Sequence, residues 1–186
     1  KDRFSRLGGA ANVAQNIKTL GAEPILCSII GDDTDSHELM QLLHEQDMPL
    51  HGVITSKERR TTTKTRIIGN NSQMLRVDKE DTFDLTEAEY KSLTDKITEI
   101  INNEKIDGII LQDYNKGVLT ETLINNVITL ANEKEIPVGV DPKKKNFLAY
   151  KNVTLFKPNL KELMEGSEAP SCDNTIDGIT KVIDAL

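Results

Sequence analysis

Apolar residues recur along this chain at two alternating spacings, and the alternation predicts a layered α/β domain. Short apolar runs are typical of buried strands in a parallel sheet, and they lie at residues 25–30, 107–111, 137–141 and 153–156. Apolar residues spaced three and four apart predict helices, at residues 13–20, 35–46, 86–103, 120–131, 160–164 and 176–186. Strands that alternate with helices favour a mostly parallel sheet with helices packed on its faces.

Residues 53–77 interrupt this alternation. Three short stretches rich in β-branched residues, at 53–55, 61–68 and 73–77, are separated by polar turns. Alternation of apolar and polar side chains is typical of antiparallel strands with one face in water. We therefore expect a small antiparallel insertion at about residues 53–77.

Composition narrows the classes of function. The chain has 186 residues, a formal net charge of -7 and a pI of about 5.1, which disfavours non-specific binding to nucleic acid. Its apolar runs are shorter than the roughly 18 residues that span a membrane. Cys27 and Cys172 have neither a disulfide-framework pattern nor a metal-ligand spacing, so we expect a reducing, cytoplasmic location.

Other site classes find no support in the sequence. His37, His44 and His51 recur every seven residues, but neighbours two helical turns apart are about 10 Å from each other, too far to share one metal. The glycine-rich dinucleotide fingerprint, the P-loop and the nucleophile elbow of serine hydrolases are all missing from the sequence.

The stretch Leu7-Gly-Gly-Ala-Ala-Asn12 opens the first predicted helix. Gly8 and Gly9 have no Cβ, so their N–H groups can approach a ligand closely at a helix N-terminus. The amide of Asn12 can both donate and accept a hydrogen bond. This arrangement suits a polyhydroxylated or phosphorylated ligand, although an ordinary tight turn before a helix produces the same pattern.

Polar residues follow the predicted strands. Ligands of open α/β sheets bind beyond the C-terminal ends of the strands, where this chain has Asp32, Asp33, Asp113, Lys116, Asp141, Lys143, Lys157 and Asn159. Acidic and basic groups at one rim suit a phosphorylated ligand held with a divalent cation. Two alternatives stay open: Asn159 and Glu162 fit a capping box, and residues 113–117 fit a solvated loop.

The insertion carries its own candidate cations in the segment Arg60-Thr-Thr-Thr-Lys-Thr-Arg66. Lys64 and Arg66 are two residues apart and therefore point to one face of a strand. The guanidinium of Arg66 can hold a phosphate through two parallel hydrogen bonds. A solvated edge strand with protective charges is the alternative interpretation.

Several of these motifs, in this order, resemble those of the ribokinase-like carbohydrate kinases. The matching segments are Gly8-Gly-Ala-Ala-Asn12 with Leu20-Gly21, Gly31-Asp-Asp33, and Lys157-Pro-Asn-Leu-Lys-Glu162. The resemblance extends from about Arg6 to Glu162. It implies a ribokinase-like layered α/β/α domain, with a mostly parallel sheet and a small antiparallel β lid at about residues 53–77.

The resemblance also implies roles for individual residues. The acceptor sugar would be bound by Gly8, Gly9, Asn12, Asp113 and Lys116. From the lid, Lys64 and Arg66 would hold the distal phosphate of the substrate. Lys157 would neutralise the transferred charge. ATP and Mg²⁺ would be positioned by Asn159, Glu162 and Asp141, with Glu162 acting on the metal through water.

Two segments most resemble the branch of this family that phosphorylates heptose 7-phosphate. They are Asp113-Tyr-Asn-Lys-Gly117, and Arg60–Arg66 followed by Gln73-Met-Leu-Arg-Val-Asp78. The resemblance implies ATP-dependent phosphorylation of the anomeric hydroxyl of D-glycero-β-D-manno-heptose 7-phosphate, for ADP-heptose and lipopolysaccharide core synthesis. It further implies a homodimer formed through the lid. Kinases for fructose phosphate or ribose, and a non-catalytic sugar-phosphate-binding module, are the alternatives.

Two features of the family do not occur in residues 1–186. These are the Asp-Thr-x-Gly-Ala-Gly-Asp segment, whose last aspartate is the family's general base, and the opening strand. The first residue is Lys1, and the apolar helical period continues to Leu186. We therefore expect residues 1–186 to be part of a longer kinase domain and to lack turnover on their own.

Overall fold

The computed structural model describes residues 2–70, 72–167 and 175–184. They form two compact units: the first comprises Lys1–Ile100 with Lys116–Val118, and the second comprises Ile101–Asn115 with Leu119–Leu186. Cys172 and the last two residues of the predicted C-terminal helix lie outside the described residues. Each unit is built around its own parallel sheet, as the alternating pattern predicts.

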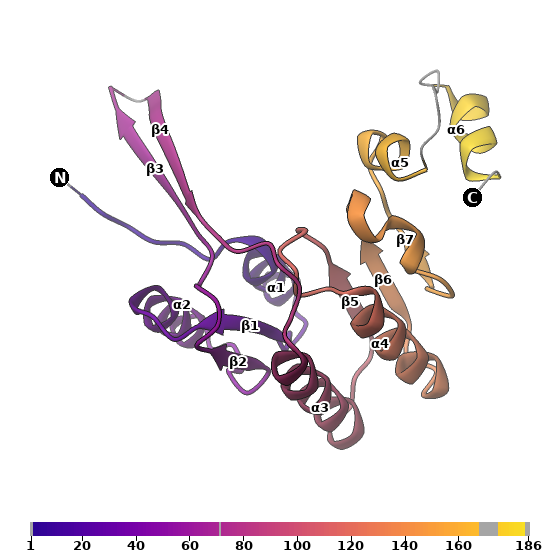
Figure 1. The fold of residues 1–186 in the computed structure, drawn as a ribbon, viewed down its shortest axis with the longest axis horizontal. Helices are drawn as coiled ribbons and strands as arrows, with labels where there is room; N and C mark the ends of the chain where they lie inside the picture. Colours follow the sequence, from indigo (N-terminus) through magenta and orange to yellow (C-terminus); the bar gives the residue numbers. More distant parts are fainter. Residues whose placement is uncertain (1, 71, 168–174, 185–186) are drawn as a thin grey trace. The chain divides into compact units, whose positions relative to one another are not determined.

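The first unit contains three helices, a parallel strand pair and an antiparallel hairpin (Figure 1). In chain order its elements are α1 (Gly9–Thr19), β1 (Ser28–Gly31), α2 (Thr34–Glu45), β2 (Val53–Ser56), β3 (Thr63–Gly69), β4 (Ser72–Lys79) and α3 (Glu87–Asn103). The core of this unit includes Leu7 before α1, Ala11 and Ala14 in α1, Leu43 in α2 and Met48 shortly after α2.

Helix α1 begins and ends as its sequence predicts. Gly8 is the N-cap residue, and Gly9 has a φ of 54°, a left-handed value that glycine tolerates without cost. At the other end Gly21 has a φ of 93°, and its N–H bonds to the carbonyl of Lys18 while that of Ala22 bonds to Ile17. This pair of bonds is the glycine-terminated helix end expected after Leu20.

Strand β2 corrects one prediction. We expected residues 53–55 to be antiparallel and part of the insertion, but Val53–Ser56 pairs in parallel with β1, with Ile29 opposite Ile54. A β-branched pattern identifies a strand without identifying its partner. Here α2 returns the chain to the edge of the sheet at which β1 begins, so that β2 runs in the same direction as β1. The three elements β1, α2 and β2 form a parallel crossover unit.

The antiparallel insertion is therefore confined to the hairpin of β3 and β4, which we call the lid. Figure 1 shows it as a ribbon that extends away from β1 and β2. Both strands are exposed on both faces, from Lys64 to Ile68 and from Ser72 to Asp78. The expectation of one dry face is wrong, because neither face of the lid is buried between these residues.

The second unit has a three-stranded parallel sheet in the order β5-β6-β7. Its elements are β5 (Ile109–Gln112), α4 (Glu121–Glu133), β6 (Val138–Asp141), the 3₁₀ helix η1 (Lys144–Ala149), β7 (Leu155–Phe156), α5 (Leu160–Gly166) and α6 (Ile176–Ile183). Helix α4 begins at the Thr120 cap and buries the apolar stripe that predicts it, Leu123, Ile124, Val127, Ile128 and Ala131. The 3₁₀ helix has no periodic signal in the sequence.

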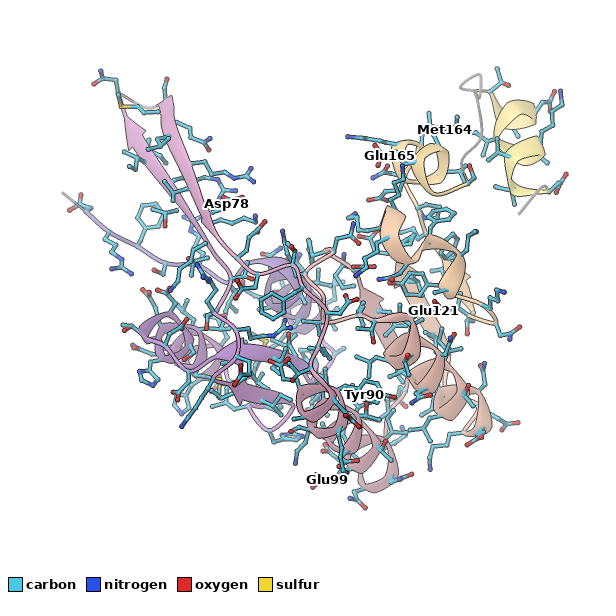
Figure 2. The ribbon with its side chains drawn as sticks, in the orientation of Figure 1. Asp78, Tyr90, Glu99, Glu121, Met164 and Glu165 are labelled. Atoms are coloured by element: carbon cyan, nitrogen blue, oxygen red, sulfur yellow. The ribbon has the colours of Figure 1, made fainter. Side chains whose placement is uncertain are left out.

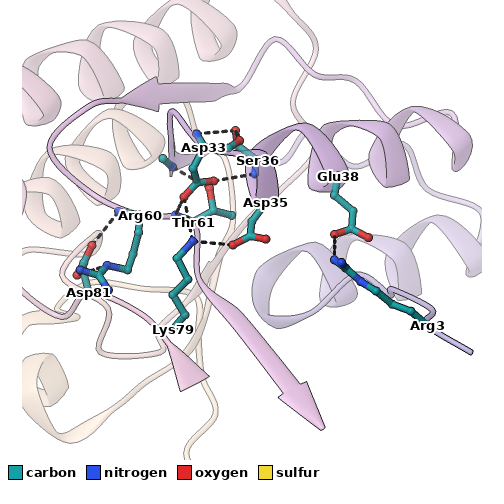
Figure 3. A network of polar contacts seen from close by, with 10 residues as sticks. Arg3, Asp33, Asp35, Ser36, Glu38, Arg60, Thr61, Lys79 and Asp81 are labelled. Carbon is teal, nitrogen blue, oxygen red and sulfur yellow. Dashed lines mark hydrogen bonds and ion pairs between the residues drawn. The ribbon is translucent and has the colours of Figure 1, made fainter. Parts of the chain in front are cut away.

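Asp33 joins the base of the lid to the start of α2 (Figure 3). One carboxylate oxygen accepts the N–H of Ser36 at 2.9 Å and the other accepts the N–H of Thr61 at 3.0 Å. Lys79, at the end of β4, lies 3.6 Å from Asp33 and 2.7 Å from Asp35. Burial works to raise the pKa of Asp33, but the bonds from Thr61 and Ser36 and the charge of Lys79 lower it to about 2.

We expect Asp33→Asn to destabilise the protein by about 2 kcal/mol at neutral pH. Because the pKa of Asp33 is lower in the folded chain than its usual 3.8, the stabilisation is fully present above the unfolded pKa. It is lost as the pH falls through the folded value. Denaturant unfolding of the full-length protein at pH 7 and near pH 2 measures the destabilisation by Asp33→Asn and its dependence on pH. Asp32→Asn, at the exposed neighbouring aspartate, is the control; an equal loss in both variants would contradict this role.

Candidate functional site

The C-terminal ends of β5, β6 and β7 gather the polar side chains that the strand order predicts. Gln112 and Asp141 are register partners at the ends of β5 and β6, and the amide of Gln112 donates to Asp141 at 2.6 Å. Lys157, directly after β7, lies with its Nζ 2.9 Å from the other oxygen of Asp141. The sheet therefore brings an acidic and a basic group together at one rim.

Glu162 belongs to the same rim through Lys143. Its carboxylate accepts the N–H of Asn159 at 2.8 Å, and Asn159 in return accepts the N–H of Glu162 at 2.9 Å. The capping box is therefore present. The other oxygen of Glu162 accepts a hydrogen bond from Lys143, whose Nζ also lies 4.0 Å from Asp141. Lys143 thus links the two carboxylates.

These pairings fix the charge of the rim at neutral pH. Burial works to raise the pKa of Asp141, while Lys157, Gln112 and Lys143 lower it below its ordinary value. Burial works to lower the pKa of Lys143, and Glu162 and Asp141 raise it. Asp141 is therefore ionised and Lys143 is cationic, so the rim can both neutralise a phosphate and attract a divalent cation.

The rim is suited to Mg²⁺ that the protein coordinates only in part. Within the described residues, no three His, Cys, Asp or Glu side chains are placed to ligate a metal together. Protein-bound Mg²⁺ usually keeps several waters and takes one or two carboxylates together with substrate phosphates. Asp141 and Glu162 fit that pattern of partial coordination. They do not form an all-protein cage.

Asp113 lies in a different environment from the one expected of a solvent-facing ligand. It is 2% exposed, and it accepts hydrogen bonds from the Tyr150 hydroxyl at 2.8 Å, the Asn146 amide at 3.1 Å and the N–H of Asn115 at 2.7 Å. Burial and the charge of Asp113 together raise the pKa of Tyr150. The carboxylate therefore anchors the 3₁₀ helix and the loop after β5 within the second unit.

The remaining candidates lie in the first unit. Gly8, Gly9 and Asn12 are exposed at the start of α1, and a Cβ at Gly8 would have no atom within 4 Å. This open backbone is consistent with a ligand-facing turn. The predicted location of these three residues at a helix N-terminus is confirmed.

The predicted lid cations share one face with Asp78 and Arg76. Lys64 is opposite Asp78 and Arg66 is opposite Arg76 in the β3–β4 register, and opposed residues of an antiparallel pair point to the same face. The side chains of the lid, including the labelled Asp78, stand out from the ribbon in Figure 2. Lys64 bonds to Asp78 at 2.8 Å, and Arg76 bonds to the same carboxylate at 2.6 Å.

Lys116 belongs to the first unit with the lid. Its Nζ bonds to Glu80, the residue that follows β4, at 2.5 Å. The predicted site residues are therefore divided between the units: the first holds Gly8, Gly9, Asn12, Lys64, Arg66 and Lys116, and the second holds Asp113, Asp141, Lys157, Asn159 and Glu162.

Three polar partners were missed by our site prediction. Gln112 is the last residue of β5, and the rule that strand ends carry ligands could have identified it. Glu80 directly follows the second lid strand, but an acidic residue there has no distinguishing pattern. Tyr150 lies in a stretch with no periodicity, so only the folded structure places it on Asp113.

Comparisons with known proteins identify relatives over nearly all of the chain. A family model described as pfkB family carbohydrate kinase matches residues 2–186. The chain is 44% identical over 163 residues to the bifunctional protein HldE of Helicobacter pylori strain G27, covering 88% of this chain and 35% of that protein. It is 39% identical over 186 residues to the bifunctional protein HldE of Helicobacter acinonychis strain Sheeba, covering 39% of it. The chain thus spans between 35% and 39% of these two relatives.

Solved structures confirm the fold class. The tetrameric inhibited form of phosphofructokinase-2 from Escherichia coli matches with a TM-score of 0.71 at 23% identity, covering 95% of this chain and 57% of that one. Ribokinase of Arabidopsis thaliana, complexed with ribose and ATP, matches with a TM-score of 0.65 at 15% identity, covering 95% and 56%. At these identities the likeness shows the ribokinase-like fold alone. No helix among the described residues is long and apolar enough to cross a membrane.

We expect Tyr150→Phe to lower the free energy of unfolding by about 2 kcal/mol, because it removes a hydrogen bond to a buried charged acceptor. The ring stays and keeps its packing against Phe156, at 6.3 Å between centroids. Denaturant unfolding of the full-length protein measures the loss. Tyr114→Phe is the matched control, since that ring is 41% exposed; a loss of the same size there would rule out a special role for the Asp113 pair.

Proposed function

The chain belongs to the pfkB family of carbohydrate kinases, and from that premise we propose that the full-length protein transfers a phosphoryl group from ATP to a sugar phosphate. The observation that carries the proposal is the rim of the second unit, where Lys143 links Asp141 to Glu162 and Lys157 also contacts Asp141. Enzymatic phosphoryl transfer depends almost entirely on positioning and charge stabilisation. Paired cations and carboxylates at one sheet edge are suited to that task.

We assign the nucleotide side of the reaction to the second unit. Lys157 is 67% exposed at its side chain, so its ammonium can turn from Asp141 towards a phosphate. Asn159 and Glu162 open α5 next to it. Asp141 and Glu162 would hold Mg²⁺, with Glu162 acting through water. When bound, the metal would neutralise charge on the transferred phosphoryl group.

We assign the acceptor side to the first unit. Gly8, Gly9 and Asn12 would bind sugar hydroxyls, since their polar groups are exposed at the start of α1. Arg66 lies directly opposite Arg76, and like charges in that position repel each other. An anion between them relieves the repulsion, and a guanidinium holds a phosphate through two bonds. The lid is therefore suited to a substrate that already carries a phosphate.

The proposed substrate is D-glycero-β-D-manno-heptose 7-phosphate, phosphorylated at its anomeric hydroxyl. The support is the resemblance of residues 113–117 and of the lid segments to the heptose 7-phosphate kinase branch. The product would supply ADP-heptose for the lipopolysaccharide core. Because the reaction consumes ATP, we place it in the cytoplasm.

A side-by-side assay of ADP release by the full-length protein tests this assignment. We expect turnover with heptose 7-phosphate and none with fructose 6-phosphate or ribose. Lys157→Met should reduce kcat about a hundredfold, because it removes a charge that stabilises the transition state. A loss of that size in the variant also shows that the activity does not come from a contaminating kinase. Turnover of another sugar would overturn the substrate and keep the kinase, whereas no turnover with any sugar would favour a binding module.

We further propose that two copies of the protein pair through the lid. Ile67 and Leu75 are opposed in the register, as are Thr65 and Val77, so three apolar side chains share the face opposite the charged one. Ile67, Leu75 and Val77 are between 48% and 51% exposed. An isolated two-stranded hairpin is at best marginally stable in water, so a second copy that covers this face would stabilise it.

We expect Leu75→Asp to convert a dimer of the full-length protein into monomers, because it places a charge at the centre of the apolar face. Light scattering after gel filtration gives the mass directly. Leu20→Asp is the matched control, since Leu20 is an exposed leucine at the C-cap of α1, outside the lid. A wild-type monomer, or a Leu75→Asp variant that stays dimeric, would exclude pairing through this face.

A further inference from the structure

Glu80 joins two lysines of the predicted acceptor site, Lys64 of the lid and Lys116. One of its carboxylate oxygens accepts Lys116 at 2.5 Å, and the other accepts Lys64 at 3.1 Å. The three side chains are between 23% and 37% exposed. One carboxylate therefore holds ammonium groups from two distant parts of the chain next to each other.

This bridge leaves both lysines able to bind a further anion. An ammonium group has three donors; Lys116 uses one of them on Glu80, and Lys64 uses two, on Glu80 and Asp78. A phosphate oxygen can therefore reach each lysine without displacing Glu80. The hydrogen bond from Lys116 is the main influence that lowers the pKa of Glu80 below its ordinary value. Glu80 is therefore ionised at neutral pH.

The backbone of Lys116 is fixed independently of its side chain. Its carbonyl accepts a hydrogen bond from Arg59 at 3.4 Å, and Arg59 is held by a buried ion pair with Glu89 at 3.1 Å. The next residue, Gly117, has a φ of 74°, and a Cβ there would lie 1.7 Å from the carbonyl oxygen of Phe83. Lys116 is therefore presented to Glu80 from a rigid support.

The charges around Glu80 match those of a phosphate. Ion pairs join three cations and two carboxylates on the lid and at its base, Lys64, Arg76, Lys116, Asp78 and Glu80, and a fourth cation, Arg66, stands directly opposite Arg76 in the register. Their sum is four positive charges less two negative ones, a net charge of +2. A phosphate monoester carries about −1.5 to −2 at neutral pH, so it would neutralise the cluster.

We propose that Glu80 is a positioning residue, which holds the ammonium groups of Lys64 and Lys116 together as a single site for the phosphate of a phosphorylated sugar. The proposal rests on the assignment of the acceptor to the first unit and adds the residue that organises it. The net positive charge of the cluster makes the site selective for phosphorylated acceptors, because an unphosphorylated sugar leaves that charge without a partner, and Glu80 contributes by positioning the two lysines.

Steady-state kinetics of the full-length protein with heptose 7-phosphate tests this role. We expect Glu80→Gln to raise KM for the sugar phosphate about tenfold, since two charge-assisted hydrogen bonds lose their common acceptor charge. The kcat and the KM for ATP should stay unchanged, because this interaction is made equally in the ground and transition states. In the double variant with Lys116→Met, Glu80→Gln should add less than it does in the wild type, because the part of its effect that acts through Lys116 is already lost and only the part through Lys64 remains.

Asp81→Asn is the matched control. Asp81 is the next residue and is also acidic, but it pairs with Arg60 and with neither lysine. An unchanged or lower KM in Glu80→Gln, additive effects of the two variants, or an equal rise in Asp81→Asn would each overturn the positioning role.

If the wild type turns over no phosphorylated sugar, the proposed function fails, and the binding of inorganic phosphate tests the role of Glu80 separately. Phosphate should then raise the melting temperature of the wild type and of Asp81→Asn but not of Glu80→Gln; any other result overturns the role.

Discussion

The buried ion pair of Arg59 and Glu89 is the interaction on which the first unit depends. Both side chains are at most 5% exposed, and desolvating such a pair is costly unless further hydrogen bonds satisfy it. Arg59 bonds to the carbonyls of Phe83 and Lys116 at 3.4 Å and lies over the Phe83 ring, while Glu89 caps α3 through Thr86. One pair thus joins the end of β2, the segment before α3 and the Lys116 loop, which are distant in sequence.

Ion pairs within the chain also organise the two functional regions, where carboxylates of the chain hold its cations. In the second unit Asp141 and Glu162 hold Lys143 and Lys157; in the first, Asp78 and Glu80 hold Lys64 and Lys116. Long side chains lose rotamer freedom when a ligand fixes them. Where an internal carboxylate has already fixed these side chains, ordering them costs less free energy when the ligand binds, and its affinity is higher.

Sequence reasoning reached the order of the helices and strands because periodicity and caps are local signals. Thr86, Thr120 and Asn159 each cap the helix that their spacing predicts, and Asp141 and Lys157 meet as strand ends of a parallel sheet should. It failed where the answer depends on a partner distant in sequence. The direction of β2 is set by β1, and the burial of Asp113 is set by Tyr150 and Asn146. No local pattern contains either fact.

Asp113 shows why a conspicuous acidic residue at a strand end is not automatically a ligand. An ionised carboxylate has about four acceptor positions, and Asp113 fills three of them with donors from its own unit. Arg66 is the opposite case: among the residues that the structure describes, none pairs with it, and the cation facing it is Arg76. A group whose hydrogen bonds are satisfied internally stabilises the fold around a site, whereas an unpaired cation beside a like charge is stabilised by an external anion. On that criterion Arg66 is the stronger candidate for contact with substrate, while the hydrogen bonds of Asp113 hold the loop that follows β5.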